Sequence, residues 1–481
     1  MKRKFVTNLI LLVTLNLLIK PFWVLGIDRT VQNVVGAESY GLYFVLFNFS
    51  MILNILLDAG ITNFNSRNIS QHRFLLHKHL SNIVGLKLVL AVVYTIFSLV
   101  VAAIIGYNKI QFHLLFFLII NQFLVSFTLY LRSNISALQL FRTDSLISVL
   151  DRTLMIIICS ILLFTNITGG IFHIEWFVYS QTIAYVITML ITMLIVISKS
   201  GRIIIRVDRK FALVFLKKSY PYAILILLMA FYNRIDSVML ERMLPDPIGK
   251  REAGVYAQAF RLLDAVAMFG ALVGGLLLPM FSSMIKKKEP VGPIVNLAIA
   301  LLFVPSIIIA VSSLLYDREI MALLYHSHIE DSADMLGLLM TGFVGIATTY
   351  IFGSLLTANG SIKELNYMAA AGMVLNVVLN LILIPRFYAL GSAVASMVTQ
   401  ISTAVVQVVI AAYVFKLRPR PIFLLKMITF ISVVVIFGIL SRQIGNRAIG
   451  YFGMIGASMV FAFFTGLINL KNLYQIIAYK K

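Results

Sequence analysis

Fourteen apolar stretches, each about as long as a bilayer is thick, follow one another along this chain. A helix crosses the hydrocarbon core with about 20 residues at a rise of about 1.5 Å each, so every stretch qualifies as a span. Because 60% of the residues are hydrophobic and only 12% are charged, no water-soluble core could bury this much apolar surface. The sequence therefore predicts an all-α integral membrane protein with about 14 transmembrane helices. The predicted spans are 8–27, 41–64, 81–105, 112–138, 145–166, 171–197, 219–240, 255–281, 292–315, 334–357, 365–385, 388–415, 422–440 and 448–469.

The basic residues are distributed unevenly between the two sides of the predicted membrane. The chain has 40 Lys and Arg against 19 Asp and Glu, a net charge of +21. With the N-terminus inside, about 25 of the bases fall in inner segments and about 9 in outer ones, so the positive-inside rule predicts that both termini are cytoplasmic. This asymmetry accounts for the charge without a nucleic-acid partner, and we expect it to attract anionic lipids at the inner surface.

The segments between the spans leave little room for chemistry in water. None is long enough for a separate catalytic domain, which takes about 50 residues or more. The one cysteine, Cys159, lies inside a span and excludes an intramolecular disulfide and cysteine-based metal clusters. No phosphate-cradling GxxxxGK[ST] loop is present. The sequence thus predicts no enzyme activity, no metal site and no cofactor.

Two loop segments indicate an internal duplication. The segments IDRTVQNVVGAESYGLY (27–43) and LERMLPDPIGKREAGVY (240–256) align with counterparts 213 positions apart, as in Gly41 and Gly254. Each joins one span to the next on the outer side, at spans one to two and seven to eight, which is the spacing of a duplicated six-span unit. We predict an N-terminal six-helix lobe at 1–200, a second at 201–418 and two additional helices at 419–481.

Three basic residues lie deep inside the predicted spans. Lys20, Arg234 and Arg261 come from the first, seventh and eighth spans, each about 10–12 Å below the outer surface. A charge near the bilayer centre costs at least about 2.5 kcal/mol unless it is paired or solvated. We predict that the three side chains line a cationic, substrate-binding cavity; the alternative is a closed lattice of ion pairs that fixes helix packing.

Three aspartates are candidates for ion coupling or charge pairing. Asp236 can form an ion pair with Arg234 or Arg261, and Asp264 shares a helix face with Arg261 at i, i+3. Asp58 lies near the inner end of the second span. It could pair with Arg67 or Lys87, or be an interfacial carboxylate.

Other polar residues within the spans are assigned to helix structure. Pro21 removes a backbone donor next to Lys20 and predicts a helix break that lines a cavity. Asn376 and Asn380 share a face at i, i+4, either for packing against a neighbouring helix or as a cavity wall. Four further charges are expected near the inner ends of their spans, where the lysine and the arginines can snorkel to the interface: Lys87, Arg132, Asp151 and Arg152.

Several motifs resemble the polysaccharide flippases of the multidrug/oligosaccharidyl-lipid/polysaccharide (MOP) exporter superfamily, which translocate O-antigen and capsule repeat units. The carriers are VVGAESYGLYFVLFNFSMILNILLDAGI (34–61), YNRIDSVML (232–240), AGVYAQAFRLLD (253–264), LLLPMFSSM (276–284) and TANGSIKELNYMAAAGMVLNVVLNLILIPRFYALGSAVASMVTQ (357–400). The resemblance implies two six-helix lobes arranged as a V, with two C-terminal helices beside them. It also implies alternating access for an undecaprenyl-pyrophosphate-linked glycan, with Lys20, Arg234 and Arg261 at the positions that meet the pyrophosphate. Lysine at the first of these positions departs from related flippases, which often have arginine there.

The sequence therefore predicts a flippase of the bacterial cytoplasmic (inner) membrane that moves a lipid-linked oligosaccharide to the outer leaflet for lipopolysaccharide or capsule assembly. We expect H+ or Na+ coupling and contacts with other polysaccharide-assembly membrane proteins. One alternative is a cation-coupled multidrug exporter of the same superfamily, which would favour acidic cavity residues. A membrane glycan polymerase is the other, but it would need a larger outer loop.

Overall fold

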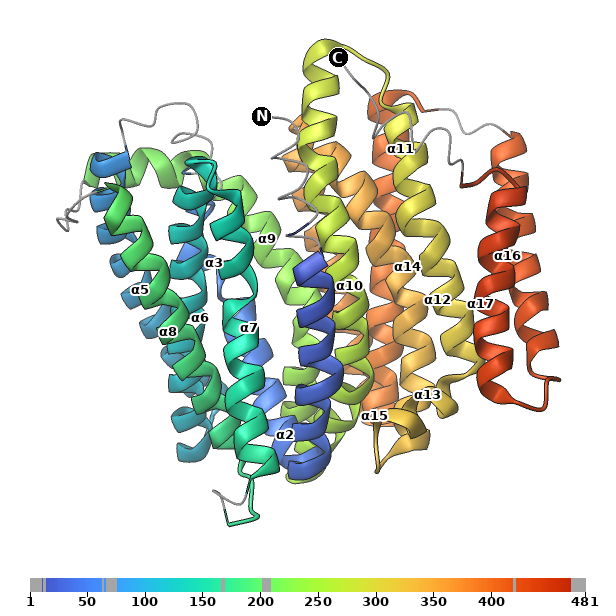
Figure 1. The fold of residues 1–481 in the computed structure, drawn as a ribbon, viewed down its shortest axis with the longest axis horizontal. Coiled ribbons are helices and arrows are strands. Elements are labelled where there is room, and N and C mark those ends of the chain that lie inside the picture. The colour runs from blue at the N-terminus through green and yellow to red at the C-terminus, as the bar shows by residue number, and fades with distance from the viewer. Residues whose placement is uncertain are drawn as a thin grey trace. The chain divides into compact units, whose positions relative to one another are not determined.

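The computed structural model describes residues 11, 14–62, 65, 76–165, 169–200, 209–417 and 421–468. All regular elements in these ranges are helices, which confirms the all-α prediction (Figure 1). Eleven of the described helical segments are long and apolar enough to cross a membrane. The long helical elements are α2 (Arg29–Ile52), α5 (Leu76–Ile105), α6 (Lys109–Ala137), α7 (Phe141–Phe164), α8 (Ile174–Ser200), α9 (Arg209–Met243), α10 (Ile248–Lys287), α11–η4–α12 (Gly292–Leu315), α14 (Ile329–Asn359), α15 (Ile362–Phe415), α16 (Pro421–Ser441) and α17 (Arg447–Phe464).

One of these elements, α15, contains two of the predicted spans. Its 54 residues are interrupted at Tyr388, whose φ of 52° and ψ of −132° are not helical. Ser392 Oγ donates a hydrogen bond of 2.8 Å to Asn380 Oδ1, twelve residues earlier. A straight helix would hold these residues about 18 Å apart, so the chain reverses at Tyr388. The stretches 365–385 and 388–415 are therefore two antiparallel helices.

The first two predicted spans form a second helical hairpin. Helical residues 14–22 lead into a π-helix, η1 (Trp23–Asp28), which continues into α2. Gly36 interrupts α2 with φ 80°, a conformation that glycine adopts without steric cost. Tyr40 Oη donates to Asp28 Oδ2 at 2.8 Å across this break, so the chain reverses at Gly36. The short helix α3 (Ile55–Asp58) follows α2 and ends at the left-handed residue Ala59.

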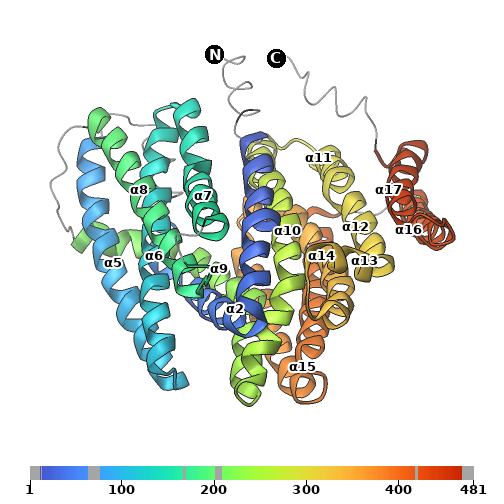
Figure 2. The same ribbon diagram turned by 60° about the horizontal axis from the view of Figure 1, so that its bottom comes forward.

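Contacts divide the chain into two compact units, Met1–Gly254 and Val255–Lys481. In the first unit α6 is central and packs against α2, α5, α7 and α8, as both ribbon views show (Figures 1 and 2). Its core where α5, α6 and α8 meet includes Ile83, Tyr130, Leu131 and Val196. The predicted lobe boundaries at 200 and 418 stay predictions.

The two loop segments of the predicted duplication meet each other inside the first unit. Gly41 lies against the backbone of Lys250 and Gly254, and Gly254 lies against the backbone of Ala37. Residues 37 and 41 are the counterparts of 250 and 254 at the offset of 213, so each segment presents the same pair of positions to the other. Such reciprocal contact is the mark of a local two-fold relation. It supports the duplication that the sequence predicts.

In the second unit α14 packs along α15 and α12. The two additional C-terminal helices, α16 and α17, pack against each other and against α12 (Figures 1 and 2). Their shared core contains Val304, Tyr316, Phe430, Val434 and Met454. The short helix α13 (Asp317–Leu324) lies in the acidic segment between α12 and α14.

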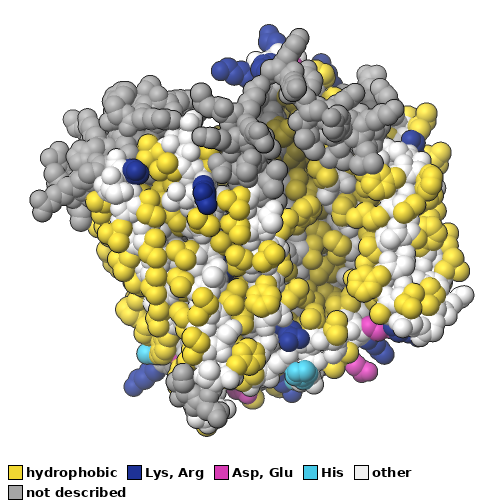
Figure 3. All heavy atoms as spheres, in the orientation of Figure 1, with side chains coloured by type: hydrophobic (Ala, Val, Ile, Leu, Met, Phe, Trp, Pro, Cys, Tyr) yellow, Lys and Arg dark blue, Asp and Glu magenta, His cyan; other side chains and the backbone are white. Residues whose placement is uncertain are grey.

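Apolar side chains cover the outward faces of the helices. On α5 the exposed side chains include Val92, Ile96, Phe97, Val100 and Ile104. Figure 3 shows hydrophobic side chains over the middle of the helices, and Asp, Glu and His side chains only near the helix ends on the face in view. A helix that exposes this much apolar surface is stable in lipid but not in water.

Candidate functional site

Lys20 lies half-buried in the first unit, one turn before η1. The charged groups that act on it most strongly are Arg152, Asp151 and Arg132, which come from α7 and α6. Helical structure continues through Pro21 and widens into the π-helix at Trp23. π-Helical turns within helices are frequent at functional sites. The lysine therefore lies at an irregular point of the membrane helix, next to three charged residues.

Arg152 is held between two aromatic rings next to Lys20. Its guanidinium carbon lies over the ring of Trp23 at 5.7 Å and over that of Tyr185 at 5.8 Å. Arg152 Nη1 also contacts Met155 Sδ at 3.3 Å, and Arg152 Nε lies 3.8 Å from Asp151 Oδ2. Aromatic rings fix a cation in place but cancel none of its formal charge.

The structure corrects the expectation that Lys87 and Arg152 snorkel to the interface. Arg152 is the twelfth residue of the 24-residue α7, and Lys87 is the twelfth of the 30-residue α5. The side chain of Lys87 is only 1% exposed. Both charges thus lie near the middle of their helices, because α7 and α5 begin about one turn earlier than the hydropathy pattern indicates. Arg132, near the C-terminal end of α6, instead pairs with Asp144 at 2.8 Å.

Arg234 lies on α9 in a polar network with α2. Arg234 Nη1 donates to Asn48 Oδ1 at 3.3 Å, and Asn48 Nδ2 donates to Ser237 Oγ at 2.9 Å. Asp236 lies beside this network and is 1% exposed. The network joins two helices that pack closely along each other. Arg234 is therefore a part-buried cation that is hydrogen-bonded to the Asn48 side chain of α2.

Arg261 and Asp264 lie on α10 within the second unit. Arg261 Nη1 is 3.5 Å from Asp264 Oδ2, and the two side chains are 11% and 16% exposed. The i, i+3 spacing brings them to one helix face, as the sequence indicates. Arg261 and Asp264 lie in the second unit, whereas Lys20 lies in the first. A cavity that Arg261 shares with Lys20 therefore stays a prediction.

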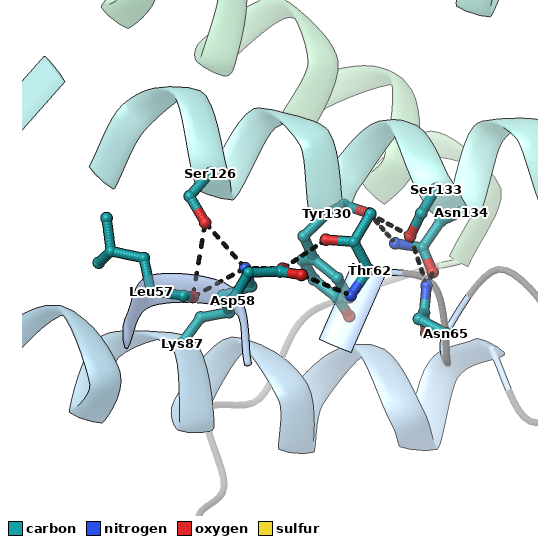
Figure 4. A network of polar contacts seen from close by, with 9 residues as sticks. All are labelled: Leu57, Asp58, Thr62, Asn65, Lys87, Ser126, Tyr130, Ser133 and Asn134. Atoms are coloured by element: carbon teal, nitrogen blue, oxygen red, sulfur yellow. Dashed lines mark hydrogen bonds and ion pairs between the residues drawn. The ribbon is translucent and has the colours of Figure 1, made fainter. Parts of the chain in front are cut away.

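Asp58 and Lys87 form an ion pair at the break after α3. Lys87 Nζ lies 2.6 Å from Asp58 Oδ1, 2.9 Å from Leu57 O and 3.0 Å from Ser126 Oγ. Figure 4 shows these groups converging from α3, α5 and α6, with Thr62 Oγ1 also donating to Asp58. Of the two partners that the sequence offers for Asp58, Lys87 is therefore engaged, and Arg67 lies outside the described residues.

Asn376 and Asn380 are fully buried in the α15 hairpin. Asn380 Nδ2 donates to Asn376 O at 3.0 Å, and Asn380 Oδ1 accepts from Ser392 on the returning helix. Such amide contacts hold the two arms of the hairpin together within the membrane. This geometry favours the packing role over the cavity wall.

An ion cluster joins the C-terminal end of α9 to the turn between α5 and α6. Arg242 lies over the ring of Tyr107 at 4.7 Å and pairs with Glu241. Glu241 Oε1 accepts from Gln111 Nε2 at 2.7 Å. Burial, followed by the charge of Glu241, raises the pKa of the Tyr107 hydroxyl above its ordinary value. The phenol therefore stays protonated at neutral pH.

The sequence predicted the deep bases but did not identify all of their neighbours. It named Lys20, Arg234 and Arg261, and it assigned Arg152 to the interface. One sequence signal could have indicated that Lys20 and Arg152 lie near each other. It is the equal spacing of Asn16 and Lys20 on one span and of Ser148 and Arg152 on another. Both pairs are i, i+4, and Asn16 Nδ2 donates to Ser148 Oγ at 2.9 Å.

Comparison with known proteins places this geometry in a family. A family model described as polysaccharide biosynthesis protein matches residues 5–285. A search of curated proteins by sequence finds no match.

Solved structures share the fold. One is a lipid II flippase, MurJ, in an inward closed conformation, with 14% identity, coverage of 98% of this chain and 100% of that one, and a TM-score of 0.68. Another is an inward-facing multidrug resistance MATE family transporter of the MOP superfamily, with 16% identity, 85% and 94% coverage, and a TM-score of 0.64. A third is a MOP superfamily transporter from Pyrococcus furiosus, described as having a binding pocket of reversed polarity, with 14% identity, 85% and 94% coverage, and a TM-score of 0.57.

The family model covers more than half of the chain, and the MurJ structure shares the helical architecture over 98% of it. The motif resemblance noted in the sequence is thereby confirmed. This chain belongs to the polysaccharide biosynthesis protein family, and it shares its fold with structures of a lipid II flippase and a MATE family transporter.

Proposed function

We propose that this transporter flips an oligosaccharide linked to undecaprenyl pyrophosphate from the cytoplasmic to the outer leaflet of a bacterial cytoplasmic membrane. The sugar and diphosphate enter the interior of the protein while the lipid tail stays in the bilayer. Alternating access then releases the head group outside, where it serves O-antigen, lipopolysaccharide or capsule assembly. No covalent step occurs, so the chain is not an enzyme.

The observation that carries the proposal is the excess of basic over acidic side chains within the spans. Lys20, Arg152 and Arg234 in the first unit and Arg261 in the second are part-buried within spans. Holding cations there costs free energy that an anionic substrate would offset. A pyrophosphate supplies that anion. An exporter of cationic drugs would be served by carboxylates instead, which argues against that alternative.

The solved structures that share this fold also support an anionic, lipid-linked substrate. The MurJ structure covers nearly the whole chain, including α16 and α17, whereas the MATE structures cover 84–85% of it. MurJ is described as a flippase for lipid II, a lipid-linked glycan. We therefore assign this chain a lipid-linked glycan rather than a drug.

The energy source in this proposal is an ion gradient. Asp236 and Asp264 are the candidate carboxylates for exchange of H+ or Na+ as the bases release substrate, because Asp58 is held in its ion pair with Lys87. Anionic lipids at the inner surface and other polysaccharide-assembly membrane proteins are the expected partners. Both termini lie in the cytoplasm in this arrangement.

The test is a flipping assay in proteoliposomes. Full-length protein is reconstituted with a fluorescent polyprenyl-diphosphate-linked sugar, and dithionite quenching reports the fraction in each leaflet. The wild type should equilibrate the probe, and Arg261→Ala should slow this at least about tenfold, because one charge-assisted contact to phosphate is lost. Arg251→Ala, an exposed change outside the cavity, is the control.

Normal flipping by a well-inserted Arg261→Ala protein would refute the anionic-substrate assignment. Ethidium transport by wild type and variant alike, with no flipping of the glycolipid, would instead establish the drug exporter.

A further inference from the structure

The first unit contains a pair of cations from two neighbouring helices. Asn16 Nδ2 donates to Ser148 Oγ at 2.9 Å, and Trp23 lies under the guanidinium of Arg152 at 5.7 Å. Asn16 contacts Ser148, and further along both helices Trp23 contacts Arg152. Residue numbers thus increase in the same direction in the two helices, so the helices run parallel. Lys20 and Arg152 each lie four residues, one turn, beyond the bonded pair. The two cations are therefore side by side on facing helix surfaces.

The carboxylates near this pair do not balance it. Arg132 is matched by Asp144 at 2.8 Å. Lys20 and Arg152 are left with Asp151, which lies 3.8 Å from Arg152 Nε. Among the described residues that act most strongly on Lys20, two are cations and one is an anion. The pair therefore keeps an excess of positive charge in a half-buried position, where an anion would be bound rather than merely attracted.

The aromatic neighbours of Arg152 organise it for a ligand. Trp23 and Tyr185 are 6% and 7% exposed, and Trp23 is itself stacked on Phe177 at 5.6 Å with an interplanar angle of 2°. These rings, together with a hydrogen bond to the Tyr185 hydroxyl, restrain the guanidinium. The side chain of Arg152 remains 27% exposed, so part of it can be reached by a ligand. A restrained guanidinium loses little entropy when it binds an oxyanion bidentately.

We propose that Lys20 and Arg152 together form a phosphate-binding subsite within the first unit, with Arg152 as the bidentate ligand and Lys20 as the point charge. The ligand class is a phosphate or diphosphate ester, and the assignment rests on the proposed function. Arg152 would supply the planar fork that lysine at position 20 lacks. Asn16, Ser148, Trp23 and Tyr185 are positioning residues that hold the two helices and the guanidinium.

Binding can be measured without transport, on full-length protein in phosphatidylcholine nanodiscs. The chain has two tryptophans, so Trp176→Phe leaves Trp23 as the only reporter, directly beside Arg152. Farnesyl diphosphate is titrated and the emission of Trp23 is followed. Microscale thermophoresis gives the dissociation constant independently, so that variants whose emission differs at the outset can still be compared.

The variants are Lys20→Gln, Arg152→Gln, Arg152→Lys and the matched control Arg251→Gln, whose side chain is 52% exposed. We expect Lys20→Gln and Arg152→Gln each to weaken binding at least about tenfold, the size of one charge-assisted hydrogen bond. Arg152→Lys should bind with intermediate affinity, because it keeps the charge but loses the fork. Arg251→Gln should match the wild type. A thermal melt of each variant distinguishes lost binding from misfolding.

Competition separates the two sources of the phosphate. Displacement of the probe by inorganic pyrophosphate, but not by phosphatidylglycerol in the nanodisc, supports a substrate diphosphate. Displacement by phosphatidylglycerol supports the same subsite as a phospholipid headgroup site.

The subsite is overturned if folded Arg152→Gln and Arg152→Lys both bind farnesyl diphosphate as tightly as the wild type. If those two variants bind normally while Arg261→Ala does not, the subsite fails but the proposed function stands. If the wild type itself binds neither farnesyl diphosphate nor pyrophosphate, both fail.

Discussion

At the scale of single residues, the surroundings of each intramembrane charge determine its role. Lys87 is 1% exposed and is neutralised by Asp58, with Leu57 O and Ser126 accepting its remaining donors. Arg152 is 27% exposed and shares one carboxylate with a second cation. The first arrangement is a closed structural pair. The second is open and retains charge, which is what a binding site needs.

The closed pair predicts an asymmetric response to mutation. Asp58→Ala leaves the Lys87 cation buried without a counter-ion and should cost about 3 kcal/mol of stability. Lys87→Met should cost only about 1 kcal/mol, because Asp58 is 25% exposed, can be hydrated and keeps its bond to Thr62. A thiol-reactive dye measures both, since the one cysteine, Cys159, is buried until the protein unfolds.

Asp246→Ala is the control for this comparison, because Asp246 pairs with Lys250 at the surface and its side chain is 66% exposed. It should change the melting temperature very little. A larger loss for Lys87→Met than for Asp58→Ala would show that the lysine, not the carboxylate, is the solvated partner.

At the scale of elements, the two helical reversals and the reciprocal glycine contact show how backbone conformation shapes the units. Gly36 turns the chain with positive φ, whereas at Tyr388 a non-glycine residue takes the same role between Pro385 and Gly391. The sequence identified the duplicated segments from charged, glycine and tyrosine positions that match at a constant offset. It could not show that the segments touch, because contact between distant helices depends on packing rather than on local pattern.

Close approach at Gly41 and Gly254 predicts that neither position tolerates a side chain. A Cβ at Gly41 would overlap the backbone of Lys250, and one at Gly254 would overlap that of Ala37. Backbone cannot rotate away as a side chain can, so Gly41→Ala and Gly254→Ala should each lower stability by about 1–3 kcal/mol. The melting temperature in detergent reports the change.

Gly453 in α17 provides the matched helical control, since a Cβ there meets no atom within 4 Å. Gly453→Ala should be neutral or stabilising by up to about 1 kcal/mol, because alanine is the better helix former. Equal stability of all three variants would contradict the close packing of the two loop segments.

At the scale of the whole molecule, hydropathy predicted the architecture well and the site only in part. All fourteen stretches have helical counterparts in the described chain, because twenty apolar residues in lipid must form a helix whatever their order. The partners of Lys20 were not predictable in the same way, and the Asp58–Lys87 pair was only one of the alternatives that the sequence left open. They depend on which helices pack together and on where each helix begins, and a shift of one turn moves a charge by about 5 Å in depth.

Membrane orientation is the last expectation that the sequence makes for the whole chain, and two engineered cysteines can test it. Lys288 follows α10 in a basic run, and Arg318 lies in the acidic segment of α13; both are exposed. One span, Gly292–Leu315, separates them. The positive-inside rule places Lys288 in the cytoplasm and Arg318 outside.

In a Cys159→Ser background, an impermeant maleimide should therefore label Arg318→Cys in intact cells and Lys288→Cys only after permeabilisation. The unmodified chain, whose cysteine is buried, should stay unlabelled in both conditions. The reverse pattern would invert the orientation and with it the direction of the proposed transport, because the basic surface would then face away from the compartment in which lipid-linked precursors are made.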